Sequence, residues 1–167
     1  MVKKNHQEIN KNMDIQVIEK PTNETICLYE KDFFLWLETT GLLLKEGRLN
    51  ELDIPNLLEE IQTLGRSERN SITSNLEVLL MHLLKYQYQP QKRTNSWRLT
   101  IYEHRDRIME SLKQSPSLRV YYQEKLLTCY QKARKKASIE TGLNIATFPE
   151  NLPFELDLIL NIDYLPE

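Results

Sequence analysis

The chain has 167 residues and a formal net charge of −2 at pH 7, with 40% hydrophobic and 28% charged residues. This length suits one domain with a buried core, and the balance of residue types is that of an ordinary soluble protein. No apolar run is long enough to form a transmembrane helix, and the first residues lack the apolar region of a signal peptide. Because Cys27 and Cys129 are far apart and no C-x-x-C occurs, we expect a cytoplasmic protein without a disulfide.

Charge is unevenly distributed along the chain. Residues 1–84 carry 9 Lys and Arg against 14 Asp and Glu, residues 85–139 carry 13 against 4, and residues 140–167 carry none against 6. Two interpretations stay open. Either the acidic ends pack against basic helices of the same domain, or the basic middle is an exposed patch for an anionic partner.

The first 27 residues are polar and show no sustained hydrophobic period, which predicts a flexible N-terminal tail. Residues 28–46 predict the first helix, which Gly47 ends. Asp53 is a candidate N-cap of the next helix, and Pro55 lies in the first turn of that helix.

The stretch from Ile54 to Tyr88 is the most strongly patterned part of the chain. At about 100° per residue, its apolar residues keep to a stripe about 120° wide, which predicts one helix of roughly 50 Å. The stripe consists of Ile54, Leu57, Ile61, Leu64, Ile72, Leu76, Leu79 and Leu83. We expect shorter helices to cover this face. Leu80 and Leu84 lie opposite the stripe, so other helices should surround the second half, and Pro90 should end the helix near Tyr88.

Two more helices and a C-terminal strap are expected after the long helix. Residues 96–114 predict one helix, and Ser115 followed by Pro116 predicts the start of another, which Gly142 ends. The remaining tail contains three prolines and predicts a strap with a short helix near residues 154–160. The expected fold is therefore an all-α bundle of about four main helices around one long central helix, forming a single domain over residues 28–167.

Polar residues interrupt the apolar stripe of the long helix at heptad spacing. Glu68, Asn75 and His82 point toward the core side, where each polar group needs a partner. Arg98 and Arg105 recur at the same spacing on the next helix. We predict a buried polar layer in which Glu68 pairs with one of these arginines and His82 bonds to a side chain or a carbonyl.

Metal binding and catalysis have little support in the sequence. Glu68, His82 and His104 are suitable ligand types, but Glu68 and His82 lie about 21 Å apart along one helix, and no E-x-x-H pair occurs. No G-x-S-x-G, G-x-G-x-x-G or P-loop motif is present, and Cys129 falls on an apolar stripe. We therefore assign no catalytic residue, metal ligand or cofactor, and an enzyme or metal protein is the weakest of three interpretations.

Two sets of basic residues are candidates for binding. In the segment from Lys85 to Arg107, cations alternate with Tyr86, Tyr88, Trp97 and Tyr102, a combination that binds phosphates and stacks on bases. The cations of this segment are Lys85, Lys92, Arg93, Arg98, Arg105 and Arg107. On the long helix, Arg66 and Arg69 lie beside Gly65, whose missing side chain permits close approach of a partner. The binding candidates are thus Arg66, Arg69, Lys92 and Arg93.

Several motifs also occur in the order that is typical of a known family. The similarity centres on the run LLEEIQTLGRSERNSITSNLEVLLMHLLKYQYQP, followed by RTNSW, TIYEHR and SPSL, with DFFLWLETTGLLLKEGRLNELD upstream and ETGL and TFPENLPFELDLIL downstream. Over residues 28–164 the chain resembles the bacterial family called domain of unknown function 29, which is abundant in cyanobacteria. The resemblance implies an all-helical domain without an assigned activity or cofactor. The family pattern includes Glu60, Gly65, Arg66, Glu68, Arg69, His82, Trp97 and Arg105.

These observations favour a non-enzymatic helical module that binds another protein or regulates one. The alternative is a nucleic-acid-associated protein that uses the segment Lys85–Arg107. We expect no membrane partner, and the sequence leaves the oligomeric state open.

Overall fold

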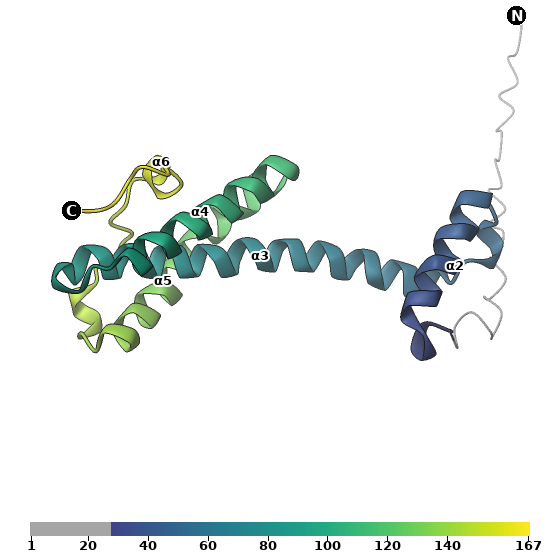
Figure 1. Ribbon diagram of the computed structural model, residues 1–167, viewed down its shortest axis with the longest axis horizontal. Helices are drawn as coiled ribbons and strands as arrows, with labels where there is room; N and C mark the ends of the chain where they lie inside the picture. Colours follow the sequence, from purple (N-terminus) through teal and green to yellow (C-terminus); the bar gives the residue numbers. More distant parts are fainter. Residues whose placement is uncertain (1–27) are drawn as a thin grey trace, which may run out of the picture. The chain divides into compact units, whose positions relative to one another are not determined.

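The computed structural model describes residues 28–167. The predicted N-terminal tail, together with Cys27, lies outside the described residues. Within the described range every regular element is a helix and none is a strand (Figure 1). The predicted all-α fold is therefore confirmed.

The helices follow one another with short connections. In chain order they are α2 (Phe33–Glu46), the 3₁₀ helix η1 (Leu49–Glu51), α3 (Ile54–Tyr88), η2 (Pro90–Lys92), α4 (Asn95–Gln114), α5 (Leu118–Thr141), η3 (Ile145–Thr147) and α6 (Leu156–Ile159). The long helix α3 has the bounds that the periodicity predicted. Residues 28–31 are also helical.

Capping residues explain where the helices begin and end. Asp32 accepts the N–H of Leu35 at 3.0 Å at the start of α2, and Thr94 accepts the N–H of Trp97 at 3.3 Å at the start of α4. Gly47 and Gly142 follow α2 and α5 in the left-handed region, with φ of 72° and 73°. Both glycines end helices, as the sequence predicted.

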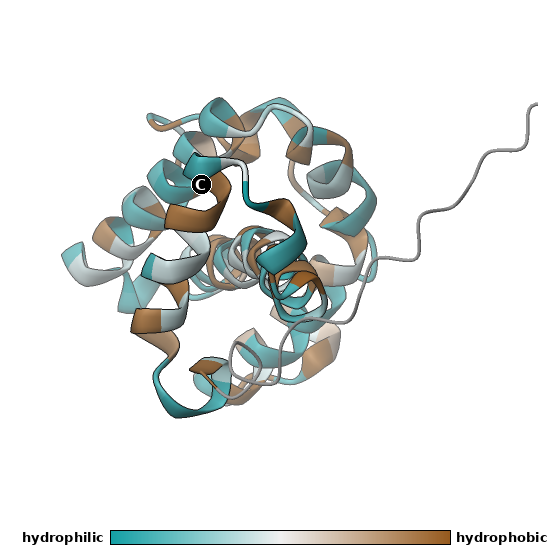
Figure 2. Ribbon diagram, turned by 90° about the vertical axis from the view of Figure 1, so that its right-hand side faces the viewer, coloured by the Kyte–Doolittle hydropathy of each residue, from teal (hydrophilic) through white to brown (hydrophobic). Residues whose placement is uncertain are grey.

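The chain divides into two compact units between Ile61 and Gln62. In the C-terminal unit the second half of α3 packs against α4, α5 and the C-terminal segment, and together they form the hydrophobic core. Figure 2 shows brown and teal segments alternating along the helical ribbons, as expected for helices that bury one face. Leu79 and Leu83 are buried on one side of α3, and Leu80 and Leu84 on the other. The prediction that other helices surround this half is confirmed.

The first half of α3 departs from the prediction that shorter helices cover its apolar face. Every residue from 61 to 71 is exposed, including Leu64 at 67%. In the C-terminal unit, α4 and α5 pack on the half of α3 that begins near Ile72. A periodic pattern identifies an apolar face on a helix, but it does not state how far the neighbouring helices extend along that face.

Candidate interaction surface

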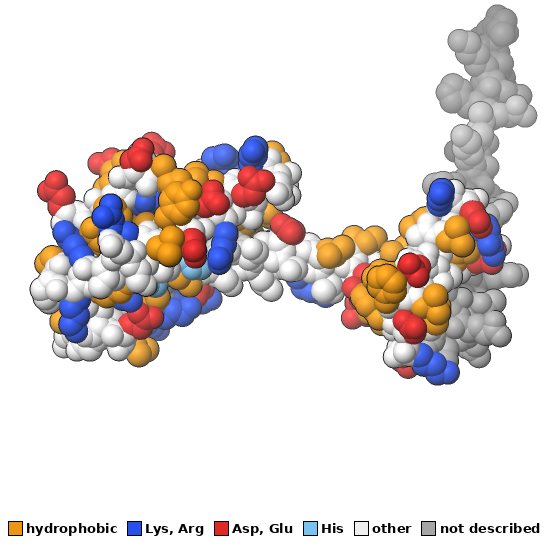
Figure 3. Space-filling model, viewed as in Figure 1, with side chains coloured by type: hydrophobic (Ala, Val, Ile, Leu, Met, Phe, Trp, Pro, Cys, Tyr) orange, Lys and Arg blue, Asp and Glu red, His pale blue; other side chains and the backbone are white. Residues whose placement is uncertain are grey.

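The N-terminal unit exposes a large amount of apolar side-chain surface. Ten large hydrophobic residues of its α2, η1 and the beginning of α3 are between 40% and 69% exposed. They are Phe33, Phe34, Leu35, Leu37, Leu42, Leu44, Leu49, Ile54, Leu58 and Ile61. On the face that Figure 3 presents, orange hydrophobic side chains lie among red and blue charged ones over this unit. We call these ten residues the N-terminal apolar surface.

A small aromatic core supports this surface. The rings of Tyr29 and Trp36 meet edge to face with their centroids 4.9 Å apart, and Trp36 is fully buried. The Tyr29 hydroxyl donates to a carboxylate oxygen of Glu60 at 2.5 Å, which joins the turn before α2 to α3. This hydrogen bond raises the pKa of Tyr29 to about 12. The backbone beneath the apolar surface is thus held by contacts within the unit.

The charges around the surface are mainly negative. Residues 28–61 contain 8 Asp and Glu against 3 Lys and Arg. Of the three cations, Arg48 is held by Glu46 and Glu51 at 2.9 and 2.5 Å. The N-terminal unit therefore combines exposed apolar side chains with a negative field.

The structure does not bring the predicted polar layer together as one cluster. Glu68 and Arg98 are exposed, and neither forms an ion pair with a described residue. Arg105 is fully buried, but its Nε and Nη1 donate to the backbone carbonyls of Ile159 and Tyr164 at 2.8 and 2.6 Å. Arg105 of the expected layer therefore donates its hydrogen bonds to main-chain carbonyls of the C-terminal segment and does not pair with Glu68.

Asn75, His82 and His104 form a smaller polar cluster between α3 and α4. His104 Nδ1 lies 2.7 Å from Asn75 Oδ1, and His82 Nδ1 lies 3.0 Å from the carbonyl oxygen of Val78. Both geometries suit a neutral ring that donates from Nδ1. Burial lowers the pKa of His82, and burial followed by the charge of Arg107 lowers that of His104. Asn75 and His82, two residues of the predicted polar layer, therefore do have hydrogen-bond partners.

The second candidate site, Arg66 and Arg69 beside Gly65, lies on the exposed part of α3. Together with Gln62 these residues line a shallow depression of about 330 Å³. A Cβ atom at Gly65 would contact nothing within 4 Å, so the surface beside it is open. Arg66 donates to Thr63 Oγ1 at 2.7 Å, and the Arg69 guanidinium lies 5.5 Å from the centroid of the Tyr121 ring.

Several cations of the segment Lys85–Arg107 are engaged within the protein. Lys85 is buried, pairs with Glu140 of α5 and lies 4.5 Å from the centroid of the Trp97 ring. Arg93 stacks 4.4 Å from the centroid of the Tyr86 ring and donates to the Tyr86 carbonyl at 2.8 Å. Lys92 and Arg98 are exposed. The basic segment therefore presents fewer free cations than its sequence implies.

An ion-pair cluster that the sequence analysis did not identify joins α3 to α5. Glu77 of α3 is buried and accepts from Lys132 and Lys136 of α5 at 2.8 and 2.6 Å. Burial opposes ionisation of Glu77, but the two lysine hydrogen bonds outweigh it and lower its pKa. The signal available in the sequence was a carboxylate on the same side of the long helix as Leu80 and Leu84, with a basic helix later in the chain.

Metal and membrane features are absent from the described part of the chain. Within residues 28–167, no group of three or more His, Cys, Asp and Glu side chains is placed to hold a metal ion. None of the helices in this range combines the length and apolar character needed to cross a bilayer.

Comparison with known proteins places the chain in a family. A family model described as "Domain of unknown function DUF29" matches residues 28–165, and the chain belongs to this family. No curated protein and no solved structure matches the chain.

Proposed function

We propose that this member of the DUF29 family is a non-enzymatic module that binds another protein through the N-terminal apolar surface. The observation that carries this proposal is the exposure of ten large hydrophobic side chains on a unit of which only residues 28–61 are described. Soluble proteins rarely expose so many large apolar side chains on one small unit unless some of them serve an interaction. Aromatic and aliphatic side chains such as Phe34 and Leu58 are suitable anchors for a protein interface.

The negative field around the surface suggests the chemistry of the partner. Since acidic residues outnumber basic ones by 8 to 3 in residues 28–61, a partner with apolar anchors and flanking Lys or Arg side chains would be favoured. An amphipathic helix with a basic polar face has this combination. We also propose that the protein is bacterial, as the family resemblance suggests, and cytoplasmic, as the features of its sequence suggest.

Nucleic-acid binding through Lys85–Arg107 is the less favoured alternative. Lys85 is neutralised by Glu140, and Arg105 is buried against carbonyls, so neither is available to a phosphate. Arg93 is stacked on Tyr86 and bonded to its carbonyl. These contacts reduce the number of cations that this segment can offer to a nucleic acid.

The test is affinity capture of the full chain from native lysate, read by quantitative mass spectrometry. The variant carries Phe34→Ser and Leu58→Ser, both at exposed positions of the apolar surface. We expect recovery of the partner to fall by about tenfold or more, because truncating interface anchors costs more than 1 kcal/mol each. The matched control carries Val120→Ser and Leu127→Ser on α5, which are 61% and 64% exposed, and it should retain the partner.

Two results would contradict the proposal. If the Phe34 and Leu58 variant keeps its partners while its thermal melt matches that of the parent chain, the apolar surface is not the interface. If all partners disappear on nuclease treatment, and capture of random nucleic acid falls steeply with salt, the nucleic-acid alternative replaces it.

A further inference from the structure

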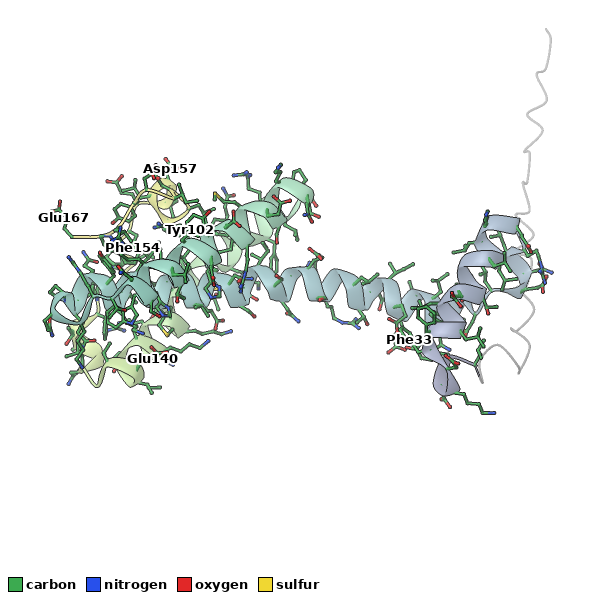
Figure 4. All side chains as sticks on the ribbon, viewed as in Figure 1. Phe33, Tyr102, Glu140, Phe154, Asp157 and Glu167 are labelled. Atoms are coloured by element: carbon green, nitrogen blue, oxygen red, sulfur yellow. The ribbon has the colours of Figure 1, made fainter. Side chains whose placement is uncertain are left out.

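A pocket of about 440 Å³ lies in the C-terminal unit, between α4 and the C-terminal segment that follows α6. Its wall combines the charged side chains of Arg98, Arg105 and Asp163 with the apolar side chains of Leu99 and Ile162. Figure 4 shows the pocket residue Tyr102 on α4, on the side of the C-terminal segment that carries Phe154 and Asp157. The volume is within the range of small-molecule sites.

Arg105 places an uncompensated positive charge in this wall. Its side chain is fully buried, and two of its nitrogen atoms donate to the carbonyls of Ile159 and Tyr164, while Nη2 has no hydrogen-bond partner. It forms no ion pair with any carboxylate in residues 28–167. Burial lowers the pKa of Arg105 to about 10, so the group is still protonated at neutral pH. Buried guanidinium groups are ordinarily paired with an anion.

Arg98 adds a second positive charge at the exposed side of the pocket. It lies two turns before Arg105 on α4, and it has no ion-pair partner among the described residues. The pocket also borders the first turn of the 20-residue helix α4 at Asn95, where the helix dipole favours an anion. Asp163 contributes one negative charge, so the side chains of the wall carry a net charge of one positive unit.

Apolar and charged side chains share the exposed rim of the pocket. Leu99, Tyr102 and Ile162 are between 41% and 56% exposed, and Arg98 and Asp163 are exposed beside them. A ligand that matches this arrangement has one negative charge and an apolar body. An anion with two charges would be repelled by Asp163, and a purely polar anion would leave the apolar rim uncovered.

We propose that this pocket binds a small organic monocarboxylate with an apolar body. The carboxylate accepts from the Arg98 guanidinium in the field of Arg105, and the apolar body lies against Leu99, Tyr102 and Ile162. This site lies within the C-terminal unit and does not depend on the interaction proposed for the N-terminal apolar surface.

The experiment is a titration of the full chain with hexanoate, followed by amide chemical shifts in NMR spectra. We expect saturable shifts at Asn95, Leu99 and Ile162. Hexanamide, which has the same apolar body without the charge, should bind at least about tenfold more weakly, because hydrogen bonds to charged groups are among the stronger ones. Arg98→Gln should weaken hexanoate binding by a similar factor. The matched control is Arg107→Gln on the same helix, outside the pocket, and it should bind as the parent does.

The role of Asp163 gives an independent readout. Inorganic phosphate should bind the parent chain more weakly than hexanoate does. Asp163→Asn should raise the affinity for phosphate severalfold and so reduce the difference in affinity between the two anions. The proposal is overturned if hexanoate gives no saturable shifts at the pocket, or if hexanamide binds as well as hexanoate. It is also overturned if Arg98→Gln binds hexanoate as the parent does, or if the parent prefers phosphate.

Discussion

Arg105 fastens the C-terminal segment to α4 through backbone carbonyls and without a carboxylate. Its hydrogen bonds reach Ile159 and Tyr164, which lie 54 and 59 residues later in the chain. Its ring neighbour Tyr164 lies 5.9 Å away, measured from the guanidinium carbon to the ring centroid. This single side chain therefore helps to hold residues 159–164 against the core.

We expect Arg105→Met to destabilise the protein by about 1–3 kcal/mol, because one buried and one partly buried carbonyl lose a charged donor. Removing an unpaired buried charge offsets part of this loss. Urea unfolding measures the effect, with the exposed Arg107→Met as the control, for which we expect a change within about 0.5 kcal/mol. If the Arg105→Met variant is as stable as the parent chain, burying the charge costs as much free energy as its hydrogen bonds contribute.

We expect the cluster of His82 and His104 to make stability depend on pH. Because burial lowers both pKa values in the folded state, the unfolded chain binds more protons just below the ordinary histidine pKa of about 6.5. Stability should therefore be highest above that pH and should fall as the pH decreases through it. The loss of the Glu77 ion pairs belongs to a lower range, below the usual carboxylate pKa.

Thermal melts between pH 7.5 and 5.5 test this prediction. The parent chain should lose stability over that range, and a variant with His82→Gln and His104→Gln should show a smaller decrease. An equal slope in both proteins would assign the pH dependence to other groups.

At the scale of the element, α3 is one continuous helix with two different environments. Ile72 and Leu76 begin the buried part, whereas residues 62–71 are all exposed. The apolar period is the same in both parts, so the difference arises from the neighbouring helices. The stabilising effect of an apolar side chain on α3 should depend on its position along the helix.

Two leucines of the same stripe and the same unit test this idea. Leu76 is fully buried and Leu64 is 67% exposed. We expect Leu76→Ala to cost about 2–5 kcal/mol by opening a cavity, and Leu64→Ala to change stability by less than about 0.5 kcal/mol. Denaturant unfolding of the two variants gives both values. Similar losses at the two positions would mean that a partner or another part of the chain covers Leu64 in solution.

Helix bounds could be predicted from sequence because their causes are local. Gly47, Pro90 and Gly142 act within one turn of their own position. The Ser115–Pro116 signal was less accurate, since α5 begins at Leu118 after a turn. Local propensity specifies that a helix starts in this region but not the residue at which it starts.

The polar contacts could be predicted only in part. Heptad spacing placed Glu68 in line with Asn75 and His82. In a straight helix, however, side chains seven residues apart differ in direction by about 20°. The neighbouring helices also cover only part of α3. Glu68 is therefore exposed, whereas Asn75 and His82 lie beside α4. The partners of Arg105 are main-chain carbonyls in an irregular segment, and side-chain patterns carry no information about such acceptors.

At the scale of the whole molecule, the hydrophobic core belongs to one of the two units. Every buried residue of the main core lies between Ile72 and Ile159, and the partly buried residues packed on it extend to Leu165. The described part of the N-terminal unit has its own small core around Trp36, Leu43 and Leu52. A single domain over residues 28–167 therefore remains a prediction that can be tested by dissection.

We expect the fragment 62–167 to fold alone, because it contains the complete main core. Circular dichroism should show a cooperative melt, and the fragment should keep the pH dependence that arises from His82 and His104. Loss of the cooperative transition in the fragment would support one indivisible domain. A fragment that melts like the full chain would instead establish two folding units.

The uncovered stretch of α3 has a further consequence for the exchange of backbone amide protons with solvent. Residues 62–71 have no buried side chain, and isolated helices shorter than about 12–15 residues are marginal in water. Their N–H groups should exchange faster than those of residues 76–84, and within residues 28–167 trypsin should cleave the folded chain first at Arg66 and Arg69. A partner that covers this stretch would slow both processes, so deuterium uptake along one helix would locate the bound partner even while its identity is unknown.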